Sequence, residues 1–335
     1  MPALKIMTFN VQMLPLTAQA VSGQSDIAEQ TADRVADAIF GLPATEQPDV
    51  IAFNEVFNED GRAQLLKRLR PVWPAVIDKL WDGVLEDDAG LMLFSRFAFL
   101  PLPTGGDRLQ RFFGDSAGAD SLASKGVGIV QIAAPVGQTT IAFTHLQASY
   151  DTEDQYSAIR AKQLDAIHAA LEEVIAADPA LRGRVIVMGD LNIRGDSGAV
   201  SGEWAALFEQ GGTQLFAGTL DGWKSYMHPP GATGADEGQT NLDFADTGRR
   251  QRLDYICLAK PGVADVVLVP QHMRIRLCNS SDHFALEAVV HVASPHATPA
   301  DAIDALGIMP NVGGQPAQPS TIRPCALDFR FDGSY

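Results

Sequence analysis

Polar side chains suited to binding a cation or moving a proton recur at the ends of apolar stretches in this chain. In chain order they are Asn10, Asn54, Glu55, His145, Asp190, Asn192, Asp254, Asp282 and His283. Each alone has an ordinary explanation, since a Gly-Asp pair at a strand end is usually a turn and a lone histidine is more often structural than catalytic. Their repetition is the signal, because the strand ends of one sheet can converge on one rim. There, carboxylates would suit a hard divalent cation, and imidazole would suit proton transfer near neutral pH.

The elements that must position these residues follow from the hydrophobic periodicity. Strands are expected over Leu4–Val11, Asp49–Asn54, Gly90–Ser95, Gly126–Ile132, Thr139–Leu146, Val185–Met188, Leu253–Leu258, Ala264–Val269 and Phe284–Val292. Helices are expected over Ser25–Gly41 (with Ser25 as N-cap), Arg62–Arg70, Ser157–Ala177 and near Glu203–Gln210. This mixture has too much strand for a simple doubly wound sheet. We expect an α/β fold in which two mixed β-sheets pack face to face with helices on the outer faces, a four-layer α/β/β/α sandwich.

Composition divides the chain into a domain and a tail. Residues 1–293 are expected to form one domain. Residues 294–335 are expected to form a C-terminal arm, because this stretch is rich in Pro and Gly and poor in large apolar residues. The loops Pro103–Lys125 and Gly218–Arg252 are long, and long loops without structure of their own are often functional.

Charge and cysteine content narrow the function classes. The 335 residues include 41 Asp+Glu against 25 Lys+Arg, a formal net charge of −16. Such a chain repels polyanions at long range, so nucleic acid is the less favoured partner unless bound cations reverse the field. Three cysteines without metal-ligand spacing form no disulfide framework. The first ten residues lack a signal-peptide pattern, so we expect a cytoplasmic protein unless a leader was removed.

The motifs around these residues resemble the endonuclease/exonuclease/phosphatase superfamily, which has the deoxyribonuclease-I-like fold. The matching blocks are Thr8–Pro15, Asp49–Glu55, Gly118–Gly126, Thr144–Ala148, Gly189–Asn192, Leu253–Ile256 and Ser281–His283. They stand in the family's order from about Lys5 to Val292. The blocks Gly118–Gly126 and Thr144–Ala148 are most similar to the branch of bacterial sphingomyelinase C and neutral sphingomyelinase.

The resemblance implies a role for each block. Glu55 would carry the metal, with Asn10 beside it and Asp282 able to hold a second cation. Mg²⁺ is expected, with Mn²⁺, Co²⁺ or Ca²⁺ as alternatives, because hard cations prefer oxygen ligands. The catalytic set would consist of His283 as general base, Asp254 as its support, Asp190 and Asn192 to position water and phosphate, and His145 to donate to a phosphate oxygen or to the leaving alkoxide.

Four further residues are candidates for substrate binding, namely Lys125, Phe113, Trp223 and Tyr226. For Lys125 the ordinary alternative is an exposed loop lysine, and for the aromatic residues it is a local anchor. On the helix that follows, Arg160 and Gln163 share one face and are expected to brace the loop after His145.

The resemblance implies a metal-dependent phosphodiesterase that hydrolyses sphingomyelin to ceramide and phosphocholine. The substrate would be a phospholipid or another phosphodiester, with peripheral membrane contact by an expected monomer. Secreted members differ, because they carry an aromatic hairpin where Ala259–Ser281 has no Trp, Tyr or Phe. They also carry paired cysteines that this chain lacks, which fits a reducing compartment. The alternatives are a Mg-dependent nuclease, a phosphoinositide phosphatase, and a non-catalytic binding module on the same fold.

Overall fold

The computed structural model describes residues 2–14, 27–80, 88–118, 120, 124–150, 155–195, 202–210, 212–223, 240–243, 249–260, 266–277 and 280–293. The chain divides into two units, Met1–His296 and Ala297–Tyr335, and every described residue belongs to the first. The arm expected over 294–335 and the N-cap expected at Ser25 therefore lie outside the described residues. The domain boundary after residue 293 stays a prediction.

Two mixed sheets form the centre of the first unit. Within the described residues, one sheet has six strands in the order β14-β15-β1-β2-β4-β3. Their bounds are Val267–Arg276, Ala285–Ala293, Leu4–Met13, Val50–Val56, Met92–Ser95 and Ala75–Ile77. The pair β1–β2 is parallel and the other pairs are antiparallel.

The second sheet has seven strands in the part of the chain described, with β10-β13-β9-β8-β7-β5 in order and β6 also paired to β7. Their bounds are Thr219–Asp221, Asp254–Ala259, Val185–Asp190, Gly137–His145, Gly126–Ala134, Phe99–Leu100 and Leu109–Phe112. Here β8–β9 is the parallel pair. A separate pair joins β11 (Asn241–Asp243) to β12 (Arg249–Gln251).

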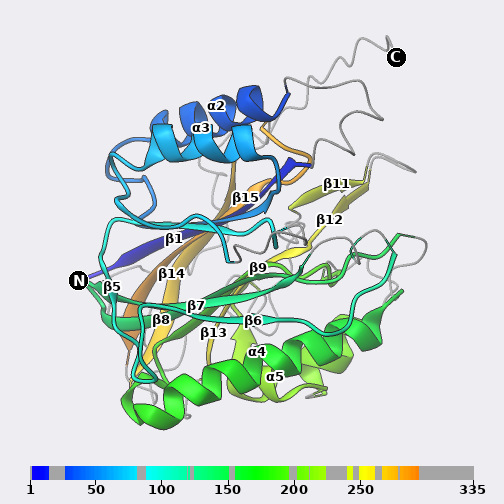
Figure 1. Ribbon diagram of the computed structural model, residues 1–335. Coiled ribbons are helices and arrows are strands. Elements are labelled where there is room, and N and C mark those ends of the chain that lie inside the picture. The colour runs from blue at the N-terminus through cyan, green and yellow to red at the C-terminus, as the bar shows by residue number, and fades with distance from the viewer. Residues whose placement is uncertain are drawn as a thin grey trace, which may run out of the picture. The chain divides into compact units, whose positions relative to one another are not determined.

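Helices cover the outer face of each sheet (Figure 1). The first sheet carries α2 (Ile27–Phe40) and α3 (Glu59–Leu69), and the second carries α4 (Ser157–Ala177) and α5 (Gln214–Gly218). Two short turns, the 3₁₀ turn η2 (Pro179–Leu181) and the π-helical turn η3 (Ala205–Glu209), complete the helical layer. The expected four-layer sandwich is confirmed. Among the described helices, none has the length and apolar character needed to cross a bilayer.

Strands that are apolar on both faces explain this layering. In β1, Leu4 and Ile6 enter the hydrophobic cluster between the two sheets, whereas Met7 and Phe9 enter the cluster beneath α2 and α3. Successive strand side chains point to opposite faces, so a strand covered on both sides must be apolar on both. Burial of each such side chain stabilises the fold by roughly 1.5–3 kcal/mol relative to exposure.

Most predicted elements are confirmed, and the differences have local causes. The helix expected from Arg62 begins at Glu59, because the Asn58 side chain accepts hydrogen bonds from the backbone N–H groups of Asp60 and Gly61 and caps the helix earlier. The stretch Pro103–Lys125, expected to be a loop, contains β6, a short strand that is half exposed and so lacks a strong apolar alternation. It forms because β7 offers it a free edge.

Gly189 allows strands β8 and β9 to approach closely where their polar ends lie. Gly189 has φ +147°, and a side chain there would place its Cβ 1.8 Å from the carbonyl oxygen of Thr144 on the neighbouring strand. Only glycine allows this approach of β9 to β8. The same Thr144 carbonyl accepts a hydrogen bond from Nδ2 of Asn54 at 2.7 Å, which joins the second sheet to the first.

Candidate active site

Residues predicted from both sheets meet in one buried group. Ligand atoms of Glu55, His145 and Asp190 lie within 4.8 Å of one another, and so do those of Asp190, Asp254 and His283. Asp190 is common to both sets and is 1% exposed. His145 on β8 and Asp254 on β13 are its register partners, so they flank it from opposite sides of β9.

Asn10 joins the two carboxylates that come from different sheets. Its Nδ2 donates to Oε1 of Glu55 at 2.8 Å and to Oδ2 of Asp190 at 3.1 Å. Its own side-chain oxygen accepts from the backbone N–H of Gln12 at 3.1 Å. In this structure Asn10 therefore orients the carboxylates through its nitrogen, and the predicted contact of its oxygen with a cation stays a prediction.

Three residues of this region adopt left-handed backbone conformations that non-glycine residues rarely take. They are Gln12 (φ 50°), Glu55 (φ 60°) and Asn192 (φ 53°). Each such residue costs on the order of 1–3 kcal/mol and persists only where its surroundings determine it. For Asn192 these surroundings include its N–H bond to Oδ1 of Asp190 at 2.8 Å and its Nδ2 bond to the Leu146 carbonyl at 3.0 Å.

The carboxylates are held where negative charge is unfavourable. Burial, followed by the nearby charge of Asp282, raises the pKa of Glu55. Burial and the neighbouring Asp254 raise the pKa of Asp190 to about 7. A divalent cation would relieve this repulsion, and carboxylate oxygens are the ligands that hard cations prefer. The carboxylates of Glu55 and Asp190 therefore fit a hard cation, whereas Nε2 of His145, which faces both of them, lies 3.2 Å from the ammonium of Lys125.

A histidine–carboxylate pair stands beside this set. His283 Nδ1 lies 2.7 Å from Oδ2 of Asp254, and His283 Nε2 lies 3.7 Å from Oδ2 of Asp190. Burial alone would lower the pKa of His283, but Asp254 and Asp190 outweigh it and hold that pKa well above its usual value. The pairing predicted from the sequence is formed, with Nε2 free of Asp254 and directed toward Asp190.

Thr240 aligns this pair and was missed in the sequence. Its hydroxyl oxygen accepts from the N–H groups of Leu253 and Asp254 at 3.2 and 3.0 Å, and its carbonyl accepts from the N–H of Phe284 at 2.5 Å. It thus ties the start of β13 to the residue after His283. A single threonine in a long loop carries no periodic signal, so only the fold could identify it.

Lys125 is buried against His145, and the exposed loop lysine considered as its alternative is wrong. Its side chain is 1% exposed, and Nζ lies 3.2 Å from Nε2 of His145, 2.9 Å from Oδ2 of Asp120 and 2.5 Å from the Leu146 carbonyl. A lysine ammonium can only donate, so Nε2 of His145 accepts and the proton of the neutral ring sits on Nδ1. Burial first, and then Lys125, lowers the pKa of His145 well below its usual value.

The predicted brace on α4 is confirmed. Arg160 Nη1 donates to the Gln147 carbonyl at 3.0 Å and to Oγ of Ser149 at 2.9 Å, while Gln163 Oε1 accepts from the N–H of Gln147 at 2.9 Å. These bonds fix the segment directly after His145.

The remaining candidates lie elsewhere. Asp282 accepts from Nε2 of Gln12 at 2.9 Å and belongs to neither ligand set, so its role with a cation stays a prediction. Trp223 is 3% exposed in the cluster between the sheets, which fits the local anchor and not a surface for substrate. Phe113 is partly buried against the cluster beneath α4. Tyr226 lies outside the described residues.

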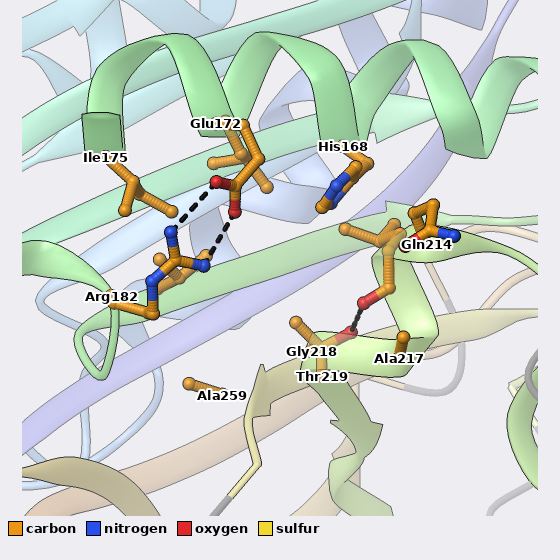
Figure 2. Close-up of a pocket in the computed structure, with 12 residues that line it drawn as sticks. His168, Glu172, Ile175, Arg182, Gln214, Ala217, Gly218, Thr219 and Ala259 are labelled. Atoms are coloured by element: carbon orange, nitrogen blue, oxygen red, sulfur yellow. Dashed lines mark hydrogen bonds and ion pairs between the residues drawn. The ribbon is translucent and has the colours of Figure 1, made fainter. Parts of the chain in front are cut away.

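A pocket of about 220 Å³ lies away from this group. It is lined by residues of α4 and α5, among them Glu172 and Gln214 (Figure 2). Val185, the first residue of β9, also lines it, whereas Asp190 is the last residue of that strand. Arg182 and Glu172 face it as an ion pair with two hydrogen bonds of 2.8 and 2.9 Å. Its charged groups are paired with each other, so it does not share the chemistry of the buried carboxylates.

Comparisons with known proteins show the family and the fold of this chain. The sequence model of the endonuclease/exonuclease/phosphatase family matches residues 7–283. A sphingomyelinase C of Bacillus cereus is 27% identical over 206 residues, which are 57% of this chain and 57% of that protein. The chain thus aligns with little more than half the length of the curated relatives it matches.

Two solved structures share the fold. Sphingomyelinase C from Streptomyces griseocarneus superposes with a TM-score of 0.59 at 19% identity, over 86% of this chain and 99% of that one. A double mutant of beta toxin from Staphylococcus aureus with bound magnesium ions gives a TM-score of 0.58 at 17% identity, over 85% and 98%. At such identities these likenesses establish the deoxyribonuclease-I-like architecture.

The histidine–carboxylate pair makes a prediction for the variant Asp254→Asn. Because Asp254 raises the pKa of His283, a neutral base forms only at higher pH, and loss of the carboxylate lowers that pKa. We expect the acid limb of the pH–rate profile to move to lower pH and the plateau to fall by about 10²–10⁴-fold. Hydrolysis of bis(4-nitrophenyl) phosphate with Mg²⁺ measures both. Asp165→Asn, on the exposed side of α4, is the control, and an acid limb that stays in place or moves upward would contradict the assignment.

The contact between Lys125 and His145 makes a second prediction. In Lys125→Met the cation that lowers the pKa of His145 is gone, so this pKa should rise, although burial still holds it below its usual value. NMR titration of the imidazole measures the shift, and steady-state kinetics should give a kcat lower by about 10–100-fold. Lys162→Met, whose side chain is 66% exposed, is the matched control. An unchanged His145 titration would show that the two groups are not in contact in solution.

Proposed function

The chain belongs to the endonuclease/exonuclease/phosphatase family, and we propose that within it the protein is a sphingomyelinase, which cleaves sphingomyelin to ceramide and phosphocholine. The coarser activity, metal-dependent hydrolysis of a phosphodiester, follows from the family and from the site. One observation carries the proposal: a set of residues that fits a cation shares Asp190 with a histidine–carboxylate pair.

Two features support a phospholipid over a nucleic acid. The Bacillus cereus relative is a sphingomyelinase C, and the two blocks most similar to that branch supply Lys125 and His145, which lie in contact. The net charge of −16 disfavours a polyanion at long range. Sphingomyelin carries one phosphodiester charge balanced by its quaternary ammonium, so it does not meet this repulsion.

The arrangement about Asp190 suggests how the reaction proceeds. A divalent cation, which we propose is Mg²⁺ held by Glu55 and Asp190, would supply positive charge opposite the phosphoryl oxygens. His283 takes the proton of the attacking water on Nε2, while its Nδ1–H keeps its proton and donates a hydrogen bond to Oδ2 of Asp254. The carboxylate of Asp254 thereby stabilises the imidazolium that forms.

The leaving group departs on the other side in this proposal. His145 and Asp254 flank Asp190 from opposite neighbouring strands, so the base and the pair of Lys125 and His145 lie on opposite sides. In-line displacement at phosphorus needs this separation. Lys125 then offers positive charge where the departing alkoxide develops, the alkoxide takes a proton from water and leaves as the alcohol, and Asn192 stays fixed beside Asp190. Peripheral membrane contact and cytoplasmic location stay predictions from the sequence.

A comparison of substrates tests the headgroup. With Mg²⁺, we expect release of phosphocholine from sphingomyelin in mixed micelles and no nicking of supercoiled plasmid, since the anionic surface repels DNA. Mass spectrometry of the headgroup and gel electrophoresis provide the measurements. EDTA should abolish turnover because it removes the metal. His283→Ala should abolish it as well, and this second result excludes a contaminating enzyme. Cleavage of DNA alone would overturn the proposal in favour of a nuclease, and phosphate release from a phosphoinositide alone would favour a phosphatase.

Metal binding is tested without turnover. We expect Mg²⁺ to stabilise the protein by about 2.7 kcal/mol at one hundred times its Kd, measured by thermal or urea unfolding. Because burial raises the pKa of Glu55 and of Asp190, Mg²⁺ displaces protons, and its midpoint concentration should fall as pH rises from 6 to 8. Glu55→Gln should lose this stabilisation, whereas Glu59→Gln, with a side chain 65% exposed, should keep it. Equal Mg²⁺ stabilisation of wild type and Glu55→Gln would remove Glu55 from the cation site.

A further inference from the structure

A buried arginine side chain outside the reacting group connects the two segments that carry Asn192 and Asp254. The side chain of Arg252 is 1% exposed, and its Nη2 lies 2.7 Å from Oδ2 of Asp221 on β10, which is 2% exposed. The same carboxylate oxygen accepts from Nε1 of Trp204 at 2.9 Å. Arg252 stands two residues before Asp254, at the entrance to β13.

Arg252 and Tyr255 both bind the segment that follows Asn192. Arg252 donates to the Gly195 carbonyl from Nε at 3.2 Å and from Nη2 at 2.8 Å. The hydroxyl of Tyr255 donates to the Ile193 carbonyl at 2.6 Å. Two backbone bonds run alongside, from Leu191 N to the Leu253 carbonyl at 3.0 Å and from Gly195 N to the Arg252 carbonyl at 3.1 Å.

The close approach of these groups requires glycine at position 195. A Cβ there would lie 2.2 Å from Nη2 of Arg252 and 2.3 Å from the hydroxyl oxygen of Tyr255. The segment is therefore shaped to receive both side chains. As a result, the chain from Asp190 to Gly195 is fixed to the chain from Arg252 to Tyr255 along its whole length.

Stability alone explains this arrangement poorly. Removal of two charges from water costs several kcal/mol per ion, and buried ion pairs can often be replaced by apolar side chains without loss of stability. A buried pair that also binds the backbone of a strained segment has a second effect, because it determines where that backbone lies. Asn192, with its left-handed φ of 53°, is the residue that needs such support.

We infer that Arg252, held by Asp221 and assisted by Tyr255, is a positioning residue for hydrolysis that fixes Asn192 relative to the Asp254–His283 pair. Arg252 acts through the backbone of Ile193–Gly195 on one side and through the start of β13 on the other. It therefore sets the distance between the Asn192 amide, which orients substrate, and His283, the base that activates water. The inference rests on the phosphodiesterase activity and not on the identity of the lipid.

The central test replaces the ion pair by apolar side chains of similar volume, Arg252→Met with Asp221→Leu. This double variant leaves no unpaired charge, but it removes the acceptor of Trp204 Nε1 and the side-chain donors to the Gly195 carbonyl, so it should fold with a Tm moderately below that of the wild type. With bis(4-nitrophenyl) phosphate and Mg²⁺, we expect kcat to fall by about 10–100-fold, as expected for small misplacements of a reacting geometry. KM and the Mg²⁺ midpoint should stay within about threefold, since Glu55 lies on the other sheet and Asp190 remains paired with β8 and β13 on both sides. The matched control is Arg182→Met with Glu172→Leu (Figure 2), which should keep the wild-type kcat.

A second variant covers the case in which the double variant does not fold. Tyr255→Phe removes only the hydroxyl that binds the Ile193 carbonyl, and it should lower kcat severalfold while amide exchange at Leu191 and Gly195 becomes faster. A double variant that folds with wild-type kcat would overturn the inference. If the double variant is unfolded, a Tyr255→Phe protein with unchanged kcat would overturn it instead. Since the substrate contains no lipid, failure to cleave sphingomyelin would be a separate result.

Discussion

The shared carboxylate of Asp190 is the constraint on which the rest of the structure depends. It ends β9 in the second sheet, yet it must reach Asn10, which belongs to the first sheet. This is possible only if the two sheets pack so that their polar strand ends coincide. The apolar cluster between the sheets and the bond from Asn54 to the Thr144 carbonyl hold them in that relation. The hydrophobic packing thus determines the chemistry by fixing one distance between sheets.

Gathering these groups destabilises the region that contains them. Buried carboxylates with raised pKa values and three left-handed residues all cost free energy. The surrounding contacts offset this cost. Arg160 and Gln163 fix the segment after His145, Thr240 fixes the start of β13 at Asp254, and Arg252 fixes the segment after Asn192. His145, Asp254 and Asn192 therefore each lie in a segment that is held by a side chain outside the cluster. A site of this kind is determined as much by these neighbours as by its own side chains.

The sequence was sufficient for the fold and for most of the reacting residues, for a definite reason. Apolar runs with a polar residue at one end mark strands that enter a core and emerge at its rim, and this pattern located Glu55, His145, Asp190 and Asp254. The pattern fails for residues whose role depends on distant neighbours. Lys125 is polar in a glycine-rich stretch, and only its contacts with Asp120, with His145 at the end of β8 and with the Leu146 carbonyl make it a buried group. Thr240 and Arg252 likewise act through backbone atoms that are distant in the chain, and Asp221 acts through the side chain of Arg252. Hydrophobic periodicity carries no information on such contacts.

The direction of approach to phosphorus follows from the same geometry. Parallel β8 and antiparallel β13 both pair with β9, and their register places His145 and Asp254 opposite Asp190 at one level of the sheet. A substrate phosphate near Asp190 would have on one side an imidazole whose proton affinity is raised by carboxylates, and on the other an imidazole held neutral by burial and a lysine. The two histidines thus differ in proton affinity because their neighbours differ in charge, and a proton can be accepted on one side while positive charge is offered on the other. The difference in proton affinity between the two histidines therefore defines the side from which water attacks phosphorus and the side on which the leaving group departs.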